Sequence, residues 1–463
     1  MERKNAWAAY AGDDGKVEAF AKAYCDFIDN GKTERECVAY GEKLAKAHGF
    51  EDLNAVVRSG RKLNAGARVY VNWMGKSFML FVLGEKPLEE GMNILGAHID
   101  SPRIDVKQNP LYEDTDLAYL DTHYYGGIKK YQWVAIPLAL HGVIVRKTGE
   151  KVIINIGEDE NDPVFCISDL LVHLAQEQMT KNAKEVVEGE ALNLIVGGRP
   201  LEGEEKDAVK ANVLKLLADK YGVEEEDFLS AELEIVPAGK ARDMGFDRSM
   251  ILAYGHDDRV CAYPSMMAVL DYEGTPEYTL CCIVTDKEEI GSVGATGMAS
   301  HYLENTVAEL YACTADYCEL AVRRCLRNSR MLSSDVSAGY DPNFASAFEK
   351  KNSAFLGRGI CFNKFTGSRG KSGSNDANPE FMASLRKIMD DAGVAFQTAE
   401  LGRVDLGGGG TIAYLCAKYG MNVIDSGIPV LSMHAPYEVV SKVDLYEGYR
   451  GYCAFLQGAK PME

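Results

Sequence analysis

The 463-residue sequence lacks both a hydrophobic run long enough to cross a bilayer and any C-x-x-C pair. The first absence argues against a membrane-spanning segment, and the second argues against a structural zinc ribbon or a redox dithiol. The twelve cysteines are scattered, as expected for reduced thiols in a cytoplasmic protein. The first 20 residues carry charges of both signs without the basic-then-apolar order of a signal peptide, which also favours the cytoplasm.

Positive charge is scarce: 50 Lys and Arg stand against 69 Asp and Glu, giving a net charge of −19. This balance argues against nucleic acid and anionic membranes as partners. A phosphate loop is also missing, because Gly370-Lys371-Ser372 has Phe365 where that motif needs its first glycine. The composition, 46% hydrophobic and 26% charged, is that of a globular protein, and the length predicts more than one domain.

One stretch combines a buried strand with acidic residues. Leu280 to Val284 is a continuous apolar run, typical of a strand covered on both faces, and Glu288 and Glu289 follow closely. Open α/β sheets place their chemistry at the carboxyl ends of such strands, where one carboxylate can hold a metal while another moves a proton. A solvated acidic loop explains an isolated Glu-Glu pair equally well, so other segments must decide.

Five apolar segments share this design, and we expect their ends to meet at one edge of a sheet. The residues that follow them are His98, Asp257, Glu289, Asp335 and His434. Nitrogen and oxygen ligands without thiolate suit Zn, Mn or Co in a catalytic site. Asp100 lies on the same side of an extended chain as His98 and could accept its second ring N–H. Taken singly, a histidine at a strand end or an Asp257-Asp258 helix cap is an ordinary structural feature.

The pattern changes between residues 103 and 247, which we predict to form a separate inserted domain. Its expected elements are strands within Val134–Val145 and Val152–Ile156, a helix at Ser168–Met179, and a helix with apolar positions from Val209 to Leu217. Residues 1–102 and 248–463 then form an α/β catalytic domain. Within it the sequence predicts a capping box at Thr33 and Glu36, a hairpin around Met74-Gly75-Lys76, and helices at Thr306–Arg327, Pro379–Ala392, Thr411–Tyr419 and Val443–Leu456.

The order and local context of these residues resemble the aspartyl aminopeptidase and vacuolar aminopeptidase I family of co-catalytic metallo-aminopeptidases. The motifs that carry the resemblance are Ala97-His-Ile-Asp-Ser-Pro102, Glu288-Glu-Ile-Gly-Ser292, Ser333-Ser-Asp-Val336 and Leu431-Ser-Met-His434. The resemblance covers essentially the whole chain, including an insertion between the first and second ligands. It implies a zinc-peptidase α/β/α sandwich carrying an inserted, largely β dimerisation domain.

The resemblance also implies a role for each residue. Asp257 would bridge two divalent metals, zinc or else Mn or Co, and the bond to Asp258 would be cis. His98 and Asp335 would complete one metal site, and Glu289 and His434 the other. Glu288 would be the general base, with Asp100 as the second residue of the catalytic pair. The activity implied is metal-dependent hydrolysis of the N-terminal peptide bond of peptides.

The inserted domain of the family makes a dimer, and dimers build a hollow tetrahedral dodecamer. His173 occupies the position of a family histidine that reaches a neighbouring subunit's active site and would contact substrate there. An ordinary residue of a helix facing a core is the alternative interpretation of His173.

The sequence departs from eukaryotic members at positions that the resemblance places at the border of the substrate pocket. Ala338 and Asp341 replace two histidines, and the loop from Gly367 to Ser374 carries Arg369 and Lys371 in a Gly/Ser frame. A preference for acidic N-terminal residues therefore does not carry over. An amidohydrolase or carboxypeptidase of the same architecture remains an alternative function, as does a non-catalytic shell or peptide-binding assembly, although the latter should have lost a ligand or the base.

Overall fold

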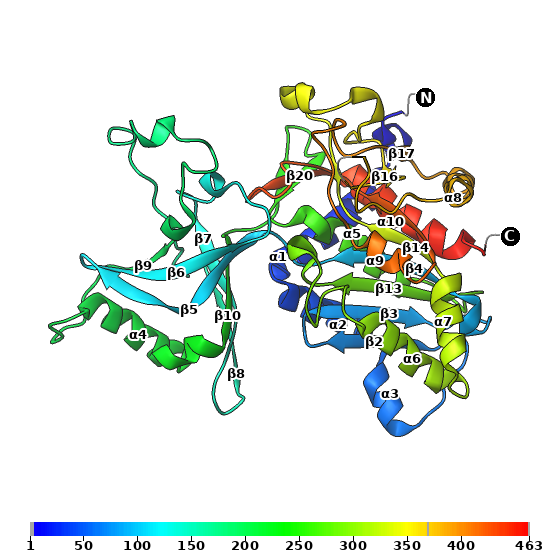
Figure 1. Cartoon of the computed structure of the whole chain (residues 1–463), viewed down its shortest axis with the longest axis horizontal. Coiled ribbons are helices and arrows are strands. Elements are labelled where there is room, and N and C mark those ends of the chain that lie inside the picture. The colour runs from blue at the N-terminus through cyan, green and yellow to red at the C-terminus, as the bar shows by residue number, and fades with distance from the viewer. Residues whose placement is uncertain (1–3, 368–369, 462–463) are drawn as a thin grey trace. The chain divides into compact units, whose positions relative to one another are not determined.

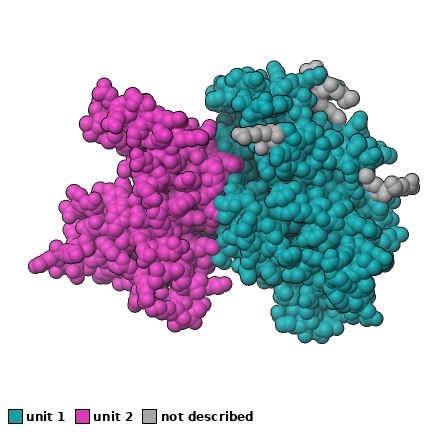
Figure 2. Space-filling model, viewed as in Figure 1, with its two compact units in different colours: residues 1–100, 241–433, 438–463 teal, residues 101–240, 434–437 magenta. Residues whose placement is uncertain are grey.

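The structure is a computed structural model, and it describes residues 4–367 and 370–461. Contacts between Cα atoms divide the chain into two compact units (Figure 2). Unit 1 comprises residues 1–100, 241–433 and 438–463, and unit 2 comprises residues 101–240 and 434–437. Residues 241–247, which we had placed in the inserted domain, belong to unit 1 because Arg242–Met244 pairs with a strand of that unit.

Unit 1 contains a nine-stranded mixed sheet (Figure 1). In spatial order its strands are β1 (Glu51–Asp52), β2 (Arg68–Trp73), β3 (Ser77–Val82), β13 (Thr279–Thr285), β4 (Met92–His98), β14 (Arg330–Ser334), β18 (Asn422–Gly427), β16 (Ile360–Asn363) and β17 (Phe396–Thr398). Strands β13 and β14 flank β4 and run parallel to it, with Thr285 opposite His98. Their carboxyl ends therefore lie at the same edge of the sheet.

Side-chain alternation explains why the sheet is buried on both faces. Every residue of β3, β4 and β13 is buried. Leu280, Cys282 and Val284 pack into one apolar cluster, while Cys281 and Ile283 pack into another on the opposite side. The continuous apolar run of the sequence is thus a strand covered on both faces, as predicted.

Helices of unit 1 supply both layers that cover the sheet. They are α1 (Gly15–Asn30), α2 (Glu34–Ala47), α3 (Leu53–Ser59), α5 (His256–Leu270), α6 (Tyr302–Thr314), α7 (Glu319–Asn328), α8 (Pro379–Asp391), α9 (Ala413–Ala417) and α10 (Lys442–Gly458). The capping box of Thr33 and Glu36 is confirmed at the start of α2, as is the hairpin turn between β2 and β3. The helix predicted at Thr306–Arg327 is two helices, because the chain turns to an extended conformation at Ala315.

A second sheet of unit 1 has five short strands. They are β11 (Arg242–Met244), β12 (Met250–Ala253), β20 (Glu438–Ser441), β19 (Pro429–Leu431) and β15 (Ser337–Ala338). The segments before Asp257 and His434 are β12 and β19, so the expectation that all five ligand-bearing strands share one sheet is wrong. Apolar periodicity identifies a strand, but it does not reveal which strand is its partner.

Unit 2 is built on a six-stranded sheet with one long helix. In spatial order the strands are β8 (Lys151–Ile156), β7 (Leu138–Val145), β10 (Ala231–Pro237), β5 (Arg103–Asp114), β6 (Leu117–Tyr125) and β9 (Leu194–Gly197), and the helix is α4 (Ala208–Tyr221). The α4 prediction is confirmed. The helix predicted at Ser168–Met179 is wrong: the chain makes turns there and leaves Leu171, Val172 and Leu174 exposed. A helix of this length is marginal in water unless an apolar face is packed, and the apolar side chains that would form that face are exposed here.

Across the described ranges, no helix combines the length and the apolar character that crossing a membrane requires.

Candidate metal centre

Three neighbouring parallel strands deliver most of the candidate side chains. His98 is the last residue of β4, Asp335 directly follows β14, and Glu288 and Glu289 lie on a 3-10 turn, η7 (Glu288–Ile290), after β13. Asp257 comes from the first turn of α5, which packs against β4. The peptide bond between Asp257 and Asp258 is cis, as the resemblance implied.

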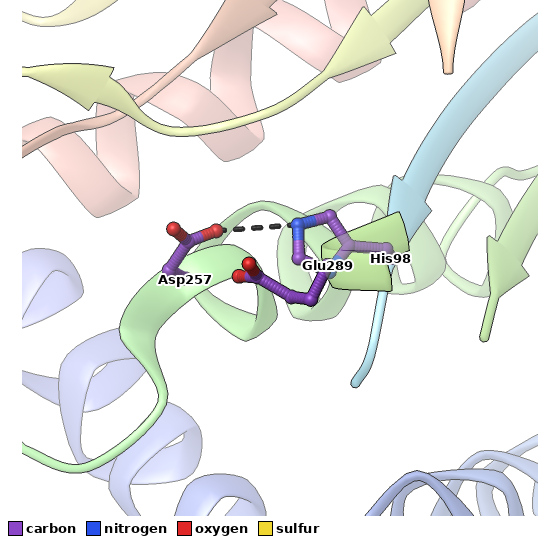
Figure 3. A group of neighbouring side chains, drawn as sticks. All are labelled: His98, Asp257 and Glu289. Atoms are coloured by element: carbon purple, nitrogen blue, oxygen red, sulfur yellow. Dashed lines mark ion pairs between the residues drawn. The ribbon is translucent and has the colours of Figure 1, made fainter. Parts of the chain in front are cut away.

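The side chains of His98, Asp257 and Glu289 converge (Figure 3). One candidate ligand atom of each lies within 4.8 Å of those of the other two, and His98 Nε2 is 3.2 Å from Asp257 Oδ1. His98 forms a second such group with Glu288 and Asp335. Imidazole nitrogen with carboxylate oxygens is a donor set that suits a divalent ion of the zinc type, so these residues fit a metal.

Asp258 is a member of the cluster that sequence reasoning missed. The carboxylate of Asp258 lies in one cluster with the carboxylates of Asp257 and Asp335. Its Oδ2 accepts a hydrogen bond from the backbone N–H of His98 at 3.3 Å. The signal is the adjacent Asp257-Asp258 pair, for which the sequence indicates a helix cap and the resemblance a cis peptide bond, but neither gives Asp258 a ligand role.

The electrostatics of the cluster favour the binding of a positively charged group. Burial raises the pKa of Asp335 well above its usual value, and the nearby carboxylates of Glu288 and Asp258 raise it further. Burial also raises the pKa of Asp258 well above normal, although the His98 imidazole opposes the shift. Burial acts to lower the pKa of His98, but its contacts with Asp100 and Asp257 raise it overall. Buried carboxylates so close together are stabilised by a bound cation, which a divalent metal supplies.

Asp100 links the histidine to the acidic turn. Its side chain is fully buried, and its Oδ1 lies 3.3 Å from His98 Nδ1, while its backbone oxygen lies 3.0 Å from the same nitrogen. Its two carboxylate oxygens accept the backbone N–H groups of Glu288 and Glu289 at 3.1 and 3.2 Å. One carboxylate therefore orients the imidazole and fixes the start of the turn.

A buried glutamate that sequence reasoning also missed holds Asp257. Glu438 on β20 is 1% exposed, and its Oε2 accepts the backbone N–H of Asp257 at 3.0 Å. No local pattern distinguished Glu438, because a single acid beside two valines is typical of many half-buried strands. His256, the residue before Asp257, faces elsewhere: its Nδ1 lies 2.7 Å from the hydroxyl of Tyr24, and burial lowers its pKa to about 3.

Two predicted residues are grouped with unit 2. His434 is half-buried there, with Nδ1 2.9 Å from the backbone oxygen of Gly127. His173 is exposed in the turns that replace the predicted helix. In the glycine-rich loop of unit 1, Lys371 pairs with Asp376 at 2.9 Å, and Arg369 lies outside the described residues.

Residues 27–456 match the family described as Aminopeptidase I zinc metalloprotease (M18). The chain belongs to this family. The resemblance stated from the sequence is confirmed, and with it the zinc-peptidase fold and the activity: this M18 protein is a metal-dependent aminopeptidase, a hydrolase of peptide bonds.

Bacterial relatives match over nearly the whole length. The chain is 58% identical over 459 residues to "Probable M18 family aminopeptidase 1" of Clostridium acetobutylicum, which covers 98% of each protein. The crystal structure of an M18 aminopeptidase from Thermotoga maritima superposes with a TM-score of 0.94 at 43% identity, covering 99% of this chain and 100% of that one.

A more distant solved structure shares the fold. The structure of the S. cerevisiae mApe1 dodecamer is 21% identical, with a TM-score of 0.75, and covers 95% of this chain and 97% of that one.

Proposed function

We propose that this M18 aminopeptidase works with two divalent ions, zinc or else Mn or Co, held around a shared Asp257. The observation that supports this proposal is the overlap of the ligand groups: Asp257 lies with His98 and Glu289 in one group and with Asp335 in another. In the division of ligands that the sequence resemblance implies, His98 and Asp335 complete one site. Glu289 completes the other with His434, whose assignment rests on the sequence resemblance.

Glu288 is the general base of the proposed mechanism. When bound, the metal ions polarise the scissile carbonyl and lower the pKa of the attacking water. Glu288 accepts a proton from that water and returns it to the departing amine nitrogen. Asp100 positions the base through the N–H of Glu288, and its contact with Nδ1 of His98 favours the tautomer that leaves Nε2 for the metal.

The acidic cluster also explains why free N-termini are the substrates. Two divalent ions balance the charge of the ligand carboxylates, and the carboxylate of Glu288, which is not a proposed ligand, attracts the positively charged terminal ammonium group of a peptide. An acylated N-terminus lacks that charge and adds bulk, so it should bind poorly.

Release of the N-terminal residue from Asp-, Glu-, Leu- and Lys-initiated peptides tests this function, with N-acetylated peptides as controls. Free peptides should be cleaved with added Zn, Mn or Co and not after chelation. Turnover of the acetylated peptides would contradict the aminopeptidase proposal and favour an amidohydrolase.

Asp257→Ala tests the shared ligand. Because a bridging carboxylate serves both ions, the variant should lose both together in metal analysis by mass spectrometry. Glu202→Gln, on the exposed surface of unit 2, is the control and should keep the metal content of the parent. Two full equivalents of metal in Asp257→Ala would exclude a bridge.

We propose that unit 2 mediates dimerisation and that dimers assemble into a tetrahedral dodecamer, with His173 reaching the substrate of a neighbouring subunit. The dodecameric yeast structure of the same fold supports the assembly. Exposed apolar side chains around His173 support an association surface in this part of unit 2. They are Leu170, Leu171, Val172, Leu174 and Met179. Sedimentation showing a stable monomer at micromolar protein would contradict this assembly.

We also propose a cytoplasmic location. All twelve cysteines are free thiols, which a reducing compartment maintains. Cell fractionation with an antibody to the chain tests the proposal, and recovery outside the cytoplasm would contradict it.

A further inference from the structure

The turn that carries Glu288 and Glu289 is held at both ends. Asp100 accepts the N–H groups of the two glutamates. The other end is Asp286, which directly follows β13 and is completely buried. Between the two anchors the chain reverses through Lys287, whose φ of 67° lies in the left-handed region.

Asp286 is bound to the β2–β3 hairpin and to the far end of its own loop. Its Oδ2 accepts the hydroxyl of Thr296 at 2.5 Å, and its backbone N–H donates to Ser77 Oγ at 3.2 Å. Asp286 also forms a parallel bridge with Gly297. Ser77 in turn donates its hydroxyl to the backbone oxygen of Thr296 at 2.6 Å. The hairpin thus fixes both limbs of the loop that includes the proposed base.

A buried ammonium group joins this arrangement. The side chain of Lys76, in the hairpin turn, is 9% exposed; its Nζ lies 2.8 Å from Glu34 Oε1 and 3.6 Å from Asp286 Oδ2. The Glu34 side chain, in the first turn of α2, is fully buried. Burial raises the pKa of Asp286, the Glu34 carboxylate raises it further, and Lys76 opposes both. The lysine therefore stands between two buried carboxylates that would otherwise repel one another.

We propose that Lys76 is a positioning residue for catalysis, holding Asp286 so that the following turn presents Glu288 to the substrate water and Glu289 to the metal. This inference rests on the proposed roles of Glu288 and Glu289. Its physical basis is that removing the Lys76 charge weakens the attraction that offsets the repulsion between the buried Glu34 and Asp286 carboxylates, so that this pair takes up a proton or draws in water, although Lys287 Nζ stays 3.2 Å from Asp286 Oδ2. Either response alters the Thr296–Asp286 hydrogen bond and moves the turn.

Lys76→Met tests the proposal, because it keeps the length and apolar stem but removes the charge. At saturating zinc, kcat should fall about ten- to a hundred-fold with KM within about twofold of the parent, since a displaced base impairs chemistry and not binding. Zinc titration of the metal-free chain should also show weaker binding, because the turn carries Glu289. A purely structural lysine would lower the melting temperature and leave kcat unchanged below it.

Two further lysine variants serve as controls. Lys76→Arg keeps the charge and should retain more activity than Lys76→Met. Lys46→Met removes a lysine from the same helix as Glu34, where it pairs with Glu42 at 2.6 Å in solvent, and it should match the parent in both kcat and zinc affinity.

A charge-balanced double variant distinguishes the positioning role of Lys76 from a role in packing alone. Lys76→Met combined with Glu34→Gln removes the repulsion on Asp286 and should recover part of the lost kcat, whereas a packing role predicts a larger loss in the double variant. Thr296→Val deletes the hydroxyl group that donates to Asp286 and should also lower kcat without raising KM. If Lys76→Met does not fold, the double variant with Glu34→Gln, compared with Lys76→Arg, decides the role of the lysine. Unchanged kcat and zinc affinity in the folded variants would overturn the inference. Failure of the proposed function itself has a separate signature, full activity in Glu288→Gln.

Discussion

The two units use buried space differently. In unit 1, helix α5 buries every residue except Met267, and among them are Asp257, Asp258 and Arg259. In unit 2, helix α4 is of similar length but buries only Val209. The core of unit 1 is covered by helices of the same unit and contains charged side chains. Hydrogen bonds hold these side chains in place, so that they can bind a metal. Both units expose some large apolar side chains, such as Phe246 and Val404 in unit 1, but in unit 2 several of them lie within one short segment, from Leu170 to Met179.

Two features of unit 2 leave apolar surface uncovered. One is the exposed apolar turn around Val172, whose side chain is 76% exposed. The other is an apolar cavity of about 440 Å³ lined by α4, by strands β7 and β8, and by Phe228 and Leu233. Contiguous apolar surface of this kind is typical of association surfaces. Unit 1 thus holds His98, Asp257, Glu289 and Asp335 of the candidate site in a buried setting, while the exposed apolar side chains of unit 2 suit contact with other chains.

The largest expected effect is the loss of turnover in Glu288→Gln. General-base catalysis contributes about 10²- to 10⁴-fold, so kcat should fall by that factor while metal content stays at the parent level, because the base is not a proposed ligand. Glu202→Gln, the exposed glutamate of unit 2, is the matched control and should be fully active. Comparable activity in both variants would contradict the assignment of Glu288 as the general base. It would also contradict the proposed difference in function between the two units.

A pair of isoleucines tests the difference in packing. Ile283 in β13 is 0% exposed, whereas Ile153 in β8 is 66% exposed. Ile283→Ala should lower the free energy of unfolding by about 2–5 kcal/mol, since it leaves a cavity in a close-packed core. Ile153→Ala should change it by about 0.5 kcal/mol or less. Urea denaturation measures both, and equal losses would show that unit 2 is packed as tightly as unit 1.

The pH dependence of stability tests the buried charges of unit 1. Burial raises the pKa of Asp425 to about 7, although hydrogen bonds such as that from Thr411 oppose the shift. The folded chain therefore keeps a proton between about pH 4 and 7 that the unfolded chain releases. The free energy of unfolding should fall as the pH rises through this window, by about 1.4 kcal/mol per pH unit for this group.

Asp425→Asn should reduce that slope in urea unfolding measured at several pH values. Some slope should remain, because burial also raises the pKa of Asp444 to about 7. Identical slopes in parent and variant would mean that Asp425 is ionised in the folded chain.

The smallest effect on folding stability is expected for Val172→Asp in unit 2. The substitution places a charge on an exposed apolar surface, so the unfolding free energy should change by about 0.5 kcal/mol or less while self-association weakens. Leu320→Asp in unit 1 is the control, since Leu320 is 53% exposed outside the proposed surface. Sedimentation velocity compares the two, and unchanged assembly of Val172→Asp would exclude this surface.

Much of the fold and most of the candidate site could be predicted from the sequence. The capping box at Thr33, the hairpin turn at Gly75 and helix α10 follow from signals within a few residues. His98, Asp257, Glu289 and Asp335 were recognisable because each follows an apolar segment in a distinctive motif. Such features depend on local backbone geometry and on side-chain periodicity, and both are encoded in short stretches of chain.

Only the tertiary structure decided how these pieces meet. It placed β12 and β19 in a separate sheet, replaced the helix expected at Ser168–Met179 with exposed turns, and brought Glu438 to Asp257 across 181 positions of sequence. Lys76, Glu34 and Asp286 likewise come from three distant segments. The physical reason is that a backbone hydrogen bond or a buried ion pair has the same chemistry with any partner. Its partner is therefore chosen by the packing of the whole unit and not by the residues beside it.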